Sequence, residues 1–155
     1  IASDSAIAKH VGGSEAFRRF VRDELFPVIN NRYRTTPERS IVGESLAGLF
    51  IVETLLRQPD MFTHYIALDP STWWDAGALT DSAATLLVRF DAKPRTLFLA
   101  NSDVKEMADG LRALNRTLQS TPPKNFQWTY IERLDLTHSN IFLGLQVEAL
   151  IHALR

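Results

Sequence analysis

The sequence predicts an α/β fold, in which a mostly parallel sheet carries helices on both faces. Short apolar segments alternate with longer segments of helical periodicity along the chain, which is the order expected of βαβ units. Proline or glycine stands near most of the boundaries between these segments, where either residue ends a helix or forms a turn. The 155 residues suffice for one domain with a buried core, and no repeat or linker divides them. We therefore expect a single domain over residues 1–155.

The elements are predicted in order from these patterns. Residues 1–13 have weak periodicity and end in two glycines, which indicates a loop. Ser14 is a suitable N-cap for a helix that reaches about residue 30, and Pro27 should disturb its last turns. Apolar patterns then predict strands at 39–42, 65–68, 96–100 and 126–131, and helices at 46–57, 81–90, 105–120 and 141–154. A looser segment at 71–78 precedes the helix at 81–90.

The predicted strands differ in pattern. The strand at 39–42 is short and apolar, which is typical of a central strand, whereas the strand at 126–131 alternates enough to suggest an edge position. A central strand needs a neighbour on each side. The α/β class is therefore predicted, but a complete sheet is not.

Composition excludes several classes of function. A formal net charge of −1 gives no electrostatic reason to bind nucleic acid, and no apolar run approaches the ~18 residues of a membrane span. Cysteine is absent, which removes disulfides, thiolate metal sites and cysteine nucleophiles. No cluster of His, Asp and Glu has metal-ligand spacing, so no metal or cofactor is predicted. Cellular compartment and oligomeric state stay open, and a homo-oligomer is one alternative.

The segment Gly43-Glu44-Ser45-Leu46-Ala47 joins the strand at 39–42 to the helix at 46–57. A serine hydroxyl becomes a useful nucleophile when a base and an acyl carbon can both reach it. A tight strand-to-helix turn presents it in this way and demands small residues two positions on either side. Gly43 and Ala47 meet that demand, so Ser45 is the predicted nucleophile and the N–H of Leu46 a predicted oxyanion donor. The alternative is that Ser45 only caps the helix.

His138 is the predicted general base. In this architecture the chain order is serine, acid, histidine. His138 lies in a loop just after the last predicted strand, where its side chain could reach the carboxyl edge of the sheet. His10 precedes the serine, His64 begins a strand and His152 lies late in the last helix.

The acid is the least determined member of the site. Asp103 is the first candidate because it follows the third predicted strand, and Glu106 is the second. Asp103 could equally cap the following helix. Asp69 and Asp135 are weaker candidates, and a Ser–His dyad without a strict acid is a further alternative.

Trp73 and Trp74 are adjacent in the segment at 71–78. Tryptophan offers a large apolar surface and one N–H donor, so the pair could line a substrate pocket. Packing against the core is the alternative for at least one of them. Glu44, directly before the serine, completes the set of candidate substrate-binding residues.

Several segments resemble the putative esterase family, which includes esterase D and the enterobactin esterases. They are residues 12–17, 23–34, 42–50 and 67–75, and Thr137-His138-Ser139 is similar to the family's catalytic-histidine loop. The resemblance implies an α/β-hydrolase fold and ester hydrolysis through an acyl-serine intermediate, with Ser45 as nucleophile and His138 as base. It does not assign the acid cleanly. It also implies strands ahead of the first helix, so that residues 1–155 would be the C-terminal, serine-to-histidine part of a hydrolase domain whose N-terminal strands are missing.

The leading hypothesis is therefore a carboxylic-ester hydrolase with Ser45, His138 and Asp103, acting on a small-molecule ester. Acyl transfer to an acceptor other than water would use the same residues. A binding module that kept the fold and lost activity is a second alternative. A half-domain that completes its sheet with another chain is a third. The identity of the ester is not predicted.

Overall fold

The computed structural model describes residues 12–153. Two compact units divide the chain, Ile1–Pro37 and Glu38–Arg155. Most of the loop predicted at 1–13 lies outside the described residues. The single domain over residues 1–155 stays a prediction.

The first unit is helical in its described part. Three segments follow one another without a break: α2 (Ser14–Phe20), a π-helical turn η1 (Val21–Leu25) and α3 (Phe26–Arg32). The helix begins at Ser14 itself, so Gly13 and not Ser14 occupies the N-cap. Pro27 has no N–H, and its ring crowds the carbonyl four residues earlier. The disturbance predicted for this proline is present, but in the wider turn just before it.

The second unit is built on a parallel sheet of four strands. These are β1 (Ser40–Glu44), β2 (His64–Leu68), β3 (Arg95–Asn101) and β4 (Phe126–Glu132), and they lie side by side in that order. The register pairs Glu44 with Leu68, and Leu68 with Ala100. Because all pairings are parallel, the carboxyl ends of the strands lie together at one end of the sheet. A ligand site is expected at this end in α/β folds.

The edges of the sheet only partly match the sequence patterns. β4 lies at one edge, as its alternating pattern indicated. β1 lies at the other edge and pairs with β2 alone among the described strands, so the central position predicted for 39–42 is not realised there. An inner position would need a strand on the free side of β1, and the described residues ahead of it are helical or irregular.

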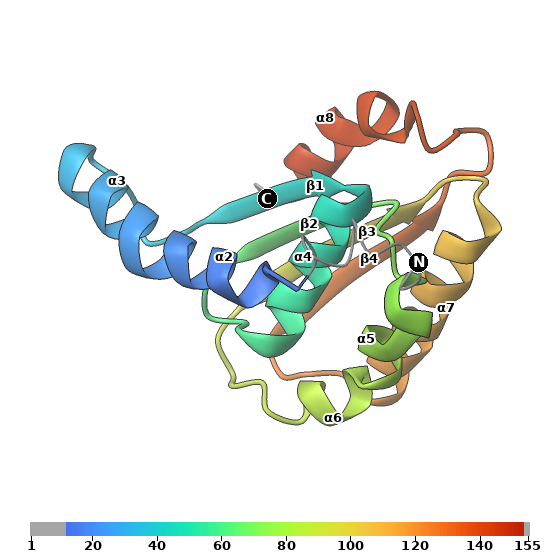
Figure 1. Cartoon of the computed structure of the whole chain (residues 1–155), viewed down its shortest axis with the longest axis horizontal. Helices are drawn as coiled ribbons and strands as arrows, with labels where there is room; N and C mark the ends of the chain where they lie inside the picture. The colour runs from blue at the N-terminus through green and yellow to red at the C-terminus, as the bar shows by residue number, and fades with distance from the viewer. Residues whose placement is uncertain (1–11, 154–155) are drawn as a thin grey trace. The chain divides into compact units, whose positions relative to one another are not determined.

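Helices cover both faces of the sheet, which confirms the predicted layering (Figure 1). The connections between neighbouring strands hold α4 (Ser45–Arg57), α5 (Ala78–Asp81), α6 (Ala83–Leu87) and α7 (Lys105–Ser120). Parallel crossovers are right-handed, and the strand order never reverses, so these helices share one face. α8 (Ile141–Ala153) covers the other face.

The region between β2 and β3 differs from its prediction. The helix expected at 81–90 is replaced by the short helices α5 and α6, and a 3-10 turn, η2 (Trp74–Gly77), precedes them. Ser82 separates the two helices, and its hydroxyl donates to the carbonyl of Leu79 at 2.9 Å. Side-chain hydrogen bonds of this kind compete with helix continuation.

A hydrophobic cluster joins the sheet to α8 and fixes the approach to His138. Its strand members alternate along β2 and β3, and its helix members recur every four residues. The cluster consists of Ile66, Leu68, Phe98, Ala100, Ile141, Leu145 and Ala149. Leu136 packs against it from the preceding loop. Since Leu136 and Ile141 flank His138 in the chain, the core holds both ends of the segment that carries this histidine.

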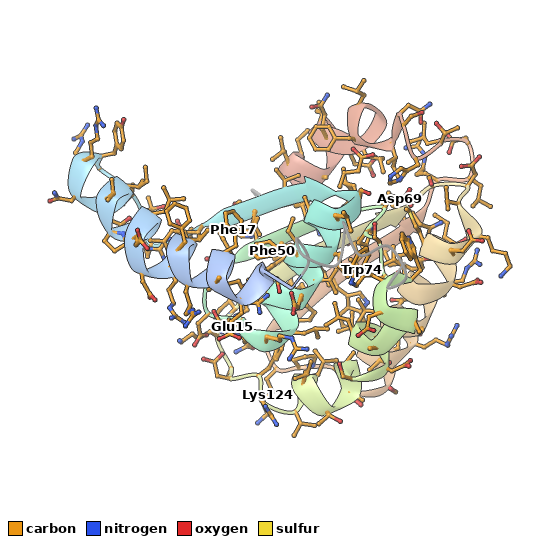
Figure 2. The ribbon with its side chains drawn as sticks, in the orientation of Figure 1. Glu15, Phe17, Phe50, Asp69, Trp74 and Lys124 are labelled. Atoms are coloured by element: carbon orange, nitrogen blue, oxygen red, sulfur yellow. The ribbon has the colours of Figure 1, made fainter. Side chains whose placement is uncertain are left out.

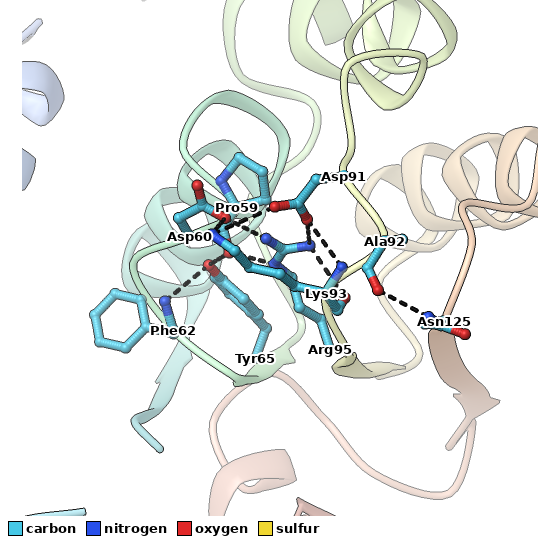
Figure 3. Close-up of polar contacts among 9 residues, drawn as sticks. All are labelled: Pro59, Asp60, Phe62, Tyr65, Asp91, Ala92, Lys93, Arg95 and Asn125. Atoms are coloured by element: carbon cyan, nitrogen blue, oxygen red, sulfur yellow. Dashed lines mark hydrogen bonds and ion pairs between the residues drawn. The ribbon is translucent and has the colours of Figure 1, made fainter. Parts of the chain in front are cut away.

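The amino end of the sheet is closed by a polar cluster around Arg95 (Figure 3). Arg95 is 3% exposed. Its guanidinium pairs with Asp60 and, at 2.7 Å, with Asp91, and its Nε donates to the carbonyl of Pro59 at 2.6 Å. The Tyr65 hydroxyl donates to that same carbonyl at 3.0 Å. A buried guanidinium is tolerated here because its donors are paired.

Candidate active site

Ser45 stands at the junction of β1 and α4. It is the first residue of α4, and its φ of 59° lies in the left-handed region. A non-glycine residue there costs on the order of 1–3 kcal/mol and persists only when its surroundings enforce it. The strained backbone turns the side chain out of the strand direction, as a presented serine requires.

Close contacts around the turn explain the small residues near Ser45. A Cβ atom at Gly43 would lie 2.8 Å from the Cβ of Ala47, which is too close for two carbon atoms. A Cβ atom at Gly48 would lie 3.0 Å from the Cα of Pro70. The methyl group of Ala47 is therefore accommodated because position 43 is glycine. The turn has the tight geometry that its sequence predicts.

His138 faces Ser45 with one ring nitrogen and Asp69 with the other. Its Nε2 lies 3.1 Å from the Oγ of Ser45, and its Nδ1 lies 2.6 Å from Oδ2 of Asp69. An ionised carboxylate can only accept hydrogen bonds, so the proton belongs on Nδ1 and Nε2 is left as an acceptor. The ring is thus oriented to receive a proton from the serine hydroxyl.

Asp69 is fully buried at the end of β2, where Figure 2 labels it. Its φ of 46° is again left-handed. Beyond His138, it accepts the N–H of Ser102 at 2.9 Å and the hydroxyl of Ser102 at 2.7 Å. Three hydrogen-bond donors therefore converge on one buried carboxylate, which compensates the cost of burying its charge.

Asn101 and Tyr130 extend this network behind Ser102. The amide of Asn101 donates to the carbonyl of Ser102 at 2.8 Å, and the Tyr130 hydroxyl donates to Oδ1 of Asn101 at 2.6 Å. Burial raises the pKa of the Tyr130 hydroxyl, and the nearby charge of Glu132 adds to the rise. Tyr130 therefore stays protonated and available as a donor near neutral pH.

The structure corrects the choice of Asp103 as the acid that orients His138. The exposed Asp103 uses its backbone N–H to bond the carbonyl of Leu136 at 3.0 Å, while Asp69 makes the contact to the histidine. Asp69 directly follows Leu68, which pairs with Ala100, so it meets the residues that follow β3 from the adjacent strand. Chain order alone favoured the loop after the third strand. The sequence feature that could have indicated Asp69 is the Asp-Pro turn directly after β2, the strand that neighbours β1 in the sheet.

The remaining predicted site residues lie around this centre. Leu46 is the second residue of α4, so its N–H has no acceptor within the helix and can serve a ligand. The rings of Trp73 and Trp74 are both half-buried and lie 5.9 Å apart. The backbone N–H of Trp74 donates to the carbonyl of Ser71 at 3.0 Å, which ties this pair to the turn after Asp69; Figure 2 labels both Trp74 and Asp69.

Glu44 is the charged group that precedes Ser45. Burial raises the pKa of its carboxyl above the ordinary value, His138 opposes the rise, and the Asp69 carboxylate adds to it. A second carboxyl beside the buried Asp69 thus prefers the neutral form more than a solvated glutamate does. Its role toward a substrate stays a prediction.

The other described histidines lie away from Ser45. His64 contacts the hydroxyl of Thr96 at 2.9 Å at the amino end of the sheet. His152 contacts the hydroxyl of Thr129 at 3.2 Å and packs on Phe98. Residues 12–153 hold no group of three or more potential metal ligands. Within the same residues, no helix has the length and apolar character needed to cross a bilayer.

Comparison with protein families places this geometry in context. The family model described as "Putative esterase" matches residues 2–125. This chain belongs to the putative esterase family. The family predicted from the sequence segments is therefore confirmed, although His138 lies outside the matched range.

Individual relatives agree with this assignment. The chain is 31% identical over 152 residues to the ferri-bacillibactin esterase BesA of Bacillus subtilis, covering 92% of this chain and 52% of that protein. A crystal structure of an IroE-like serine hydrolase from Shewanella oneidensis matches with a TM-score of 0.84 at 26% identity, over 92% of this chain and 48% of that one. The BES protein of Bacillus cereus matches with a TM-score of 0.80 at 21% identity, over 90% and 54%. The α/β-hydrolase fold is thereby confirmed, and the chain spans about half the length of these relatives.

Proposed function

We propose that this protein is a carboxylic-ester hydrolase that acts through an acyl-serine intermediate on Ser45. The observation that carries the proposal is the continuous set of hydrogen bonds from Ser45 through His138 to Asp69, at 3.1 and 2.6 Å. Membership of an esterase family supports the reaction class. Asp69 replaces Asp103 in this account as the acid.

Acylation follows from the orientation of the histidine. The Oγ of Ser45 bonds to the ester carbonyl carbon while Nε2 of His138 takes the hydroxyl proton. The carbonyl electron pair moves to its oxygen, toward which the N–H of Leu46 can donate. The bond to the alcohol oxygen then breaks, and His138 gives its proton to the leaving alcohol. Asp69 holds the ring and stabilises its protonated form throughout.

Deacylation repeats these roles with water as the nucleophile. His138 takes a proton from water while the water oxygen bonds to the acyl carbon, and then returns a proton to Oγ as the carbon–Oγ bond breaks. The acid product leaves and Ser45 regains its hydroxyl. If an alcohol replaced water in this step, the same residues would transfer the acyl group, which is the acyltransferase alternative.

The substrate class that we propose is an ester-linked siderophore. BesA is named as a ferri-bacillibactin esterase, and a relative from Aspergillus fumigatus, 30% identical over 67 residues, is named as a siderophore triacetylfusarinine C esterase. The adjacent rings of Trp73 and Trp74 would offer apolar surface to such a ligand.

Ester hydrolysis tests the proposal in the full-length protein. Substrates would be p-nitrophenyl butyrate and ferri-bacillibactin, and the variants Ser45→Ala and His138→Gln, with Ser82→Ala as a control that removes a hydroxyl between α5 and α6. We expect kcat/KM to fall by at least about 1,000-fold in the first two variants and to be retained in the control. A folded wild-type protein that hydrolyses neither ester would favour the inactive binding module. Product formed only with an added alcohol would favour the acyltransferase.

A further inference from the structure

The turn Asp69-Pro70-Ser71 contacts both Ser45 and His138. Asp69 contacts His138, and Ser71, two residues later, makes two contacts with Ser45. The N–H of Ser71 donates to the carbonyl of Ser45 at 3.0 Å, and its hydroxyl oxygen lies 3.4 Å from the Oγ of Ser45. A single three-residue turn therefore fixes the relative positions of the two reacting side chains.

The Ser71 side chain is 1% exposed. A buried hydroxyl requires a hydrogen-bond partner, and Oγ of Ser45 lies within reach. If the Ser45 hydroxyl donates to Nε2 of His138, its oxygen has lone pairs but no second proton to offer. The Ser71 hydroxyl then acts as the donor and the Ser45 oxygen as the acceptor.

The helix α7 contacts the residue that follows this turn. The Thr72 hydroxyl donates to the carbonyl of Met107 at 3.3 Å, and a Cβ atom at Gly110 would lie only 2.2 Å from that hydroxyl oxygen. Thr72 therefore occupies the space that a side chain at position 110 would fill. The contact of Thr72 with α7 thus holds the chain directly after Ser71.

We propose that Ser71 is a positioning residue, whose hydroxyl donates a hydrogen bond to the Oγ of Ser45 and stabilises the charge that develops on this oxygen. The inference rests on the proposed function. At 3.4 Å the bond is long for two hydroxyl oxygens and contributes little at rest. It strengthens as Oγ loses its proton, because hydrogen bonds to charged oxygens are shorter and stronger. An interaction that grows toward the transition state raises kcat more than it lowers KM.

Kinetics of Ser71→Ala, Ser71→Thr and Ser82→Ala test this in the full-length protein. We expect Ser71→Ala to lower kcat for p-nitrophenyl butyrate and the rate of labelling by a fluorophosphonate by about tenfold, the effect of one such hydrogen bond. KM should be nearly unchanged. Ser71→Thr keeps a hydroxyl and should recover part of the rate, while Ser82→Ala should match the wild type.

Two results would overturn the inference. Unchanged or faster labelling of Ser71→Ala would mean that the Ser71 hydroxyl is idle or withdraws the Ser45 proton from His138. Equal losses in a folded Ser71→Thr and Ser71→Ala would mean that shape, and not the hydroxyl, matters at this position. Ser45→Ala separates the two proposals: if it abolishes activity while Ser71→Ala retains it, only the role of Ser71 fails, and if Ser45→Ala keeps full activity, both fail.

Discussion

At the amino end of the sheet, Arg95 pairs with two carboxylates that remain partly solvated, since the side chains of Asp60 and Asp91 are 62% and 43% exposed. At the carboxyl end, the carboxylate of Asp69 is fully buried and accepts hydrogen bonds from His138 and Ser102. Both ends thus bury one charged side chain. At the carboxyl end, the histidine that contacts the buried carboxylate also faces a serine, because Nε2 of His138 lies 3.1 Å from the Oγ of Ser45.

Backbone strain separates the two ends further. Ser45 and Asp69 both have φ in the left-handed region, immediately after β1 and β2. Asn125 is left-handed before β4 at the amino end, but asparagine tolerates this conformation better than most residues. We therefore expect the polar contacts at the amino end to contribute to stability, and those at the carboxyl end to hold Ser45 and Asp69 in strained conformations for the proposed reaction.

The largest expected effect is the loss of kcat when Asp69 is replaced, compared with the same replacement at Asp103. Asp69→Asn should lower kcat for p-nitrophenyl butyrate by about 1,000- to 10,000-fold, because an amide can hold the histidine in the wrong tautomer. The matched change Asp103→Asn alters an exposed residue and should leave kcat within about twofold. Steady-state kinetics of the two variants measures this. A larger loss of kcat in Asp103→Asn than in Asp69→Asn would identify Asp103 as the acid.

A change at the other end of the sheet should affect stability and not activity. Arg95→Met removes the hydrogen bonds of a buried guanidinium and should lower the free energy of unfolding by about 2–4 kcal/mol. Arg57→Met, which removes one exposed pair with Glu53, should cost less than about 1 kcal/mol. Urea denaturation gives both values. A loss of kcat in folded Arg95→Met would contradict the division between the two ends.

Gly110→Ala tests whether the packing of α7 against Thr72 affects the site at the carboxyl end of the sheet. Alanine normally stabilises a helix over glycine by up to about 1 kcal/mol. Here its Cβ atom would overlap the Thr72 hydroxyl, so a net loss of about 1–3 kcal/mol is expected, with lower kcat because Ser71 moves. Gly13→Ala, where no atom lies within 4 Å of the added Cβ and φ is −80°, offers a glycine control without a steric clash. A Gly110→Ala protein with increased stability and full activity would contradict the role of α7 in holding the turn at residues 69–71.

The smallest effect concerns pH. Hydrogen bonds from Arg95 and the Lys93 backbone lower the pKa of Asp91 from 3.8 to about 2. A lowered folded-state pKa means that the contribution of Asp91 to stability is present above pH 3.8 and is lost as the pH falls toward 2. Asp91→Asn should therefore flatten the pH dependence of unfolding in this window. An unchanged slope would show that Asp91 is not coupled to folding.

Most of the fold follows from local sequence patterns. The helix predicted at 105–120 has those bounds in α7, and the strand predicted at 126–131 is one residue shorter than β4. Long periodic segments are well determined because packing and propensity favour the same structure. The helix predicted at 81–90 was wrong: α6 covers only residues 83–87 of this range, and α5 ends at Asp81, next to Ser82, whose hydroxyl bonds the carbonyl of Leu79.

The site was harder to predict than the fold. The sequence could single out Ser45 and His138, whose side chains lie 3.1 Å apart, because it displays both the small residues around the serine and the loop after the last strand. The pairing of His138 with Asp69 depends on the register of β2 against β3 and on a left-handed backbone at Asp69. Neither is encoded in a short motif. Ser71 was not singled out at all, since its contact with Ser45 joins residues far apart in sequence.

Fluorophosphonate labelling followed by peptide mass spectrometry tests the central claim most directly. The account predicts one adduct on the full-length protein, located on Ser45, which disappears in Ser45→Ala and forms far more slowly in His138→Gln. A folded protein that takes up no probe, or that carries the adduct on a different serine, would contradict the assignment of Ser45 as an activated nucleophile.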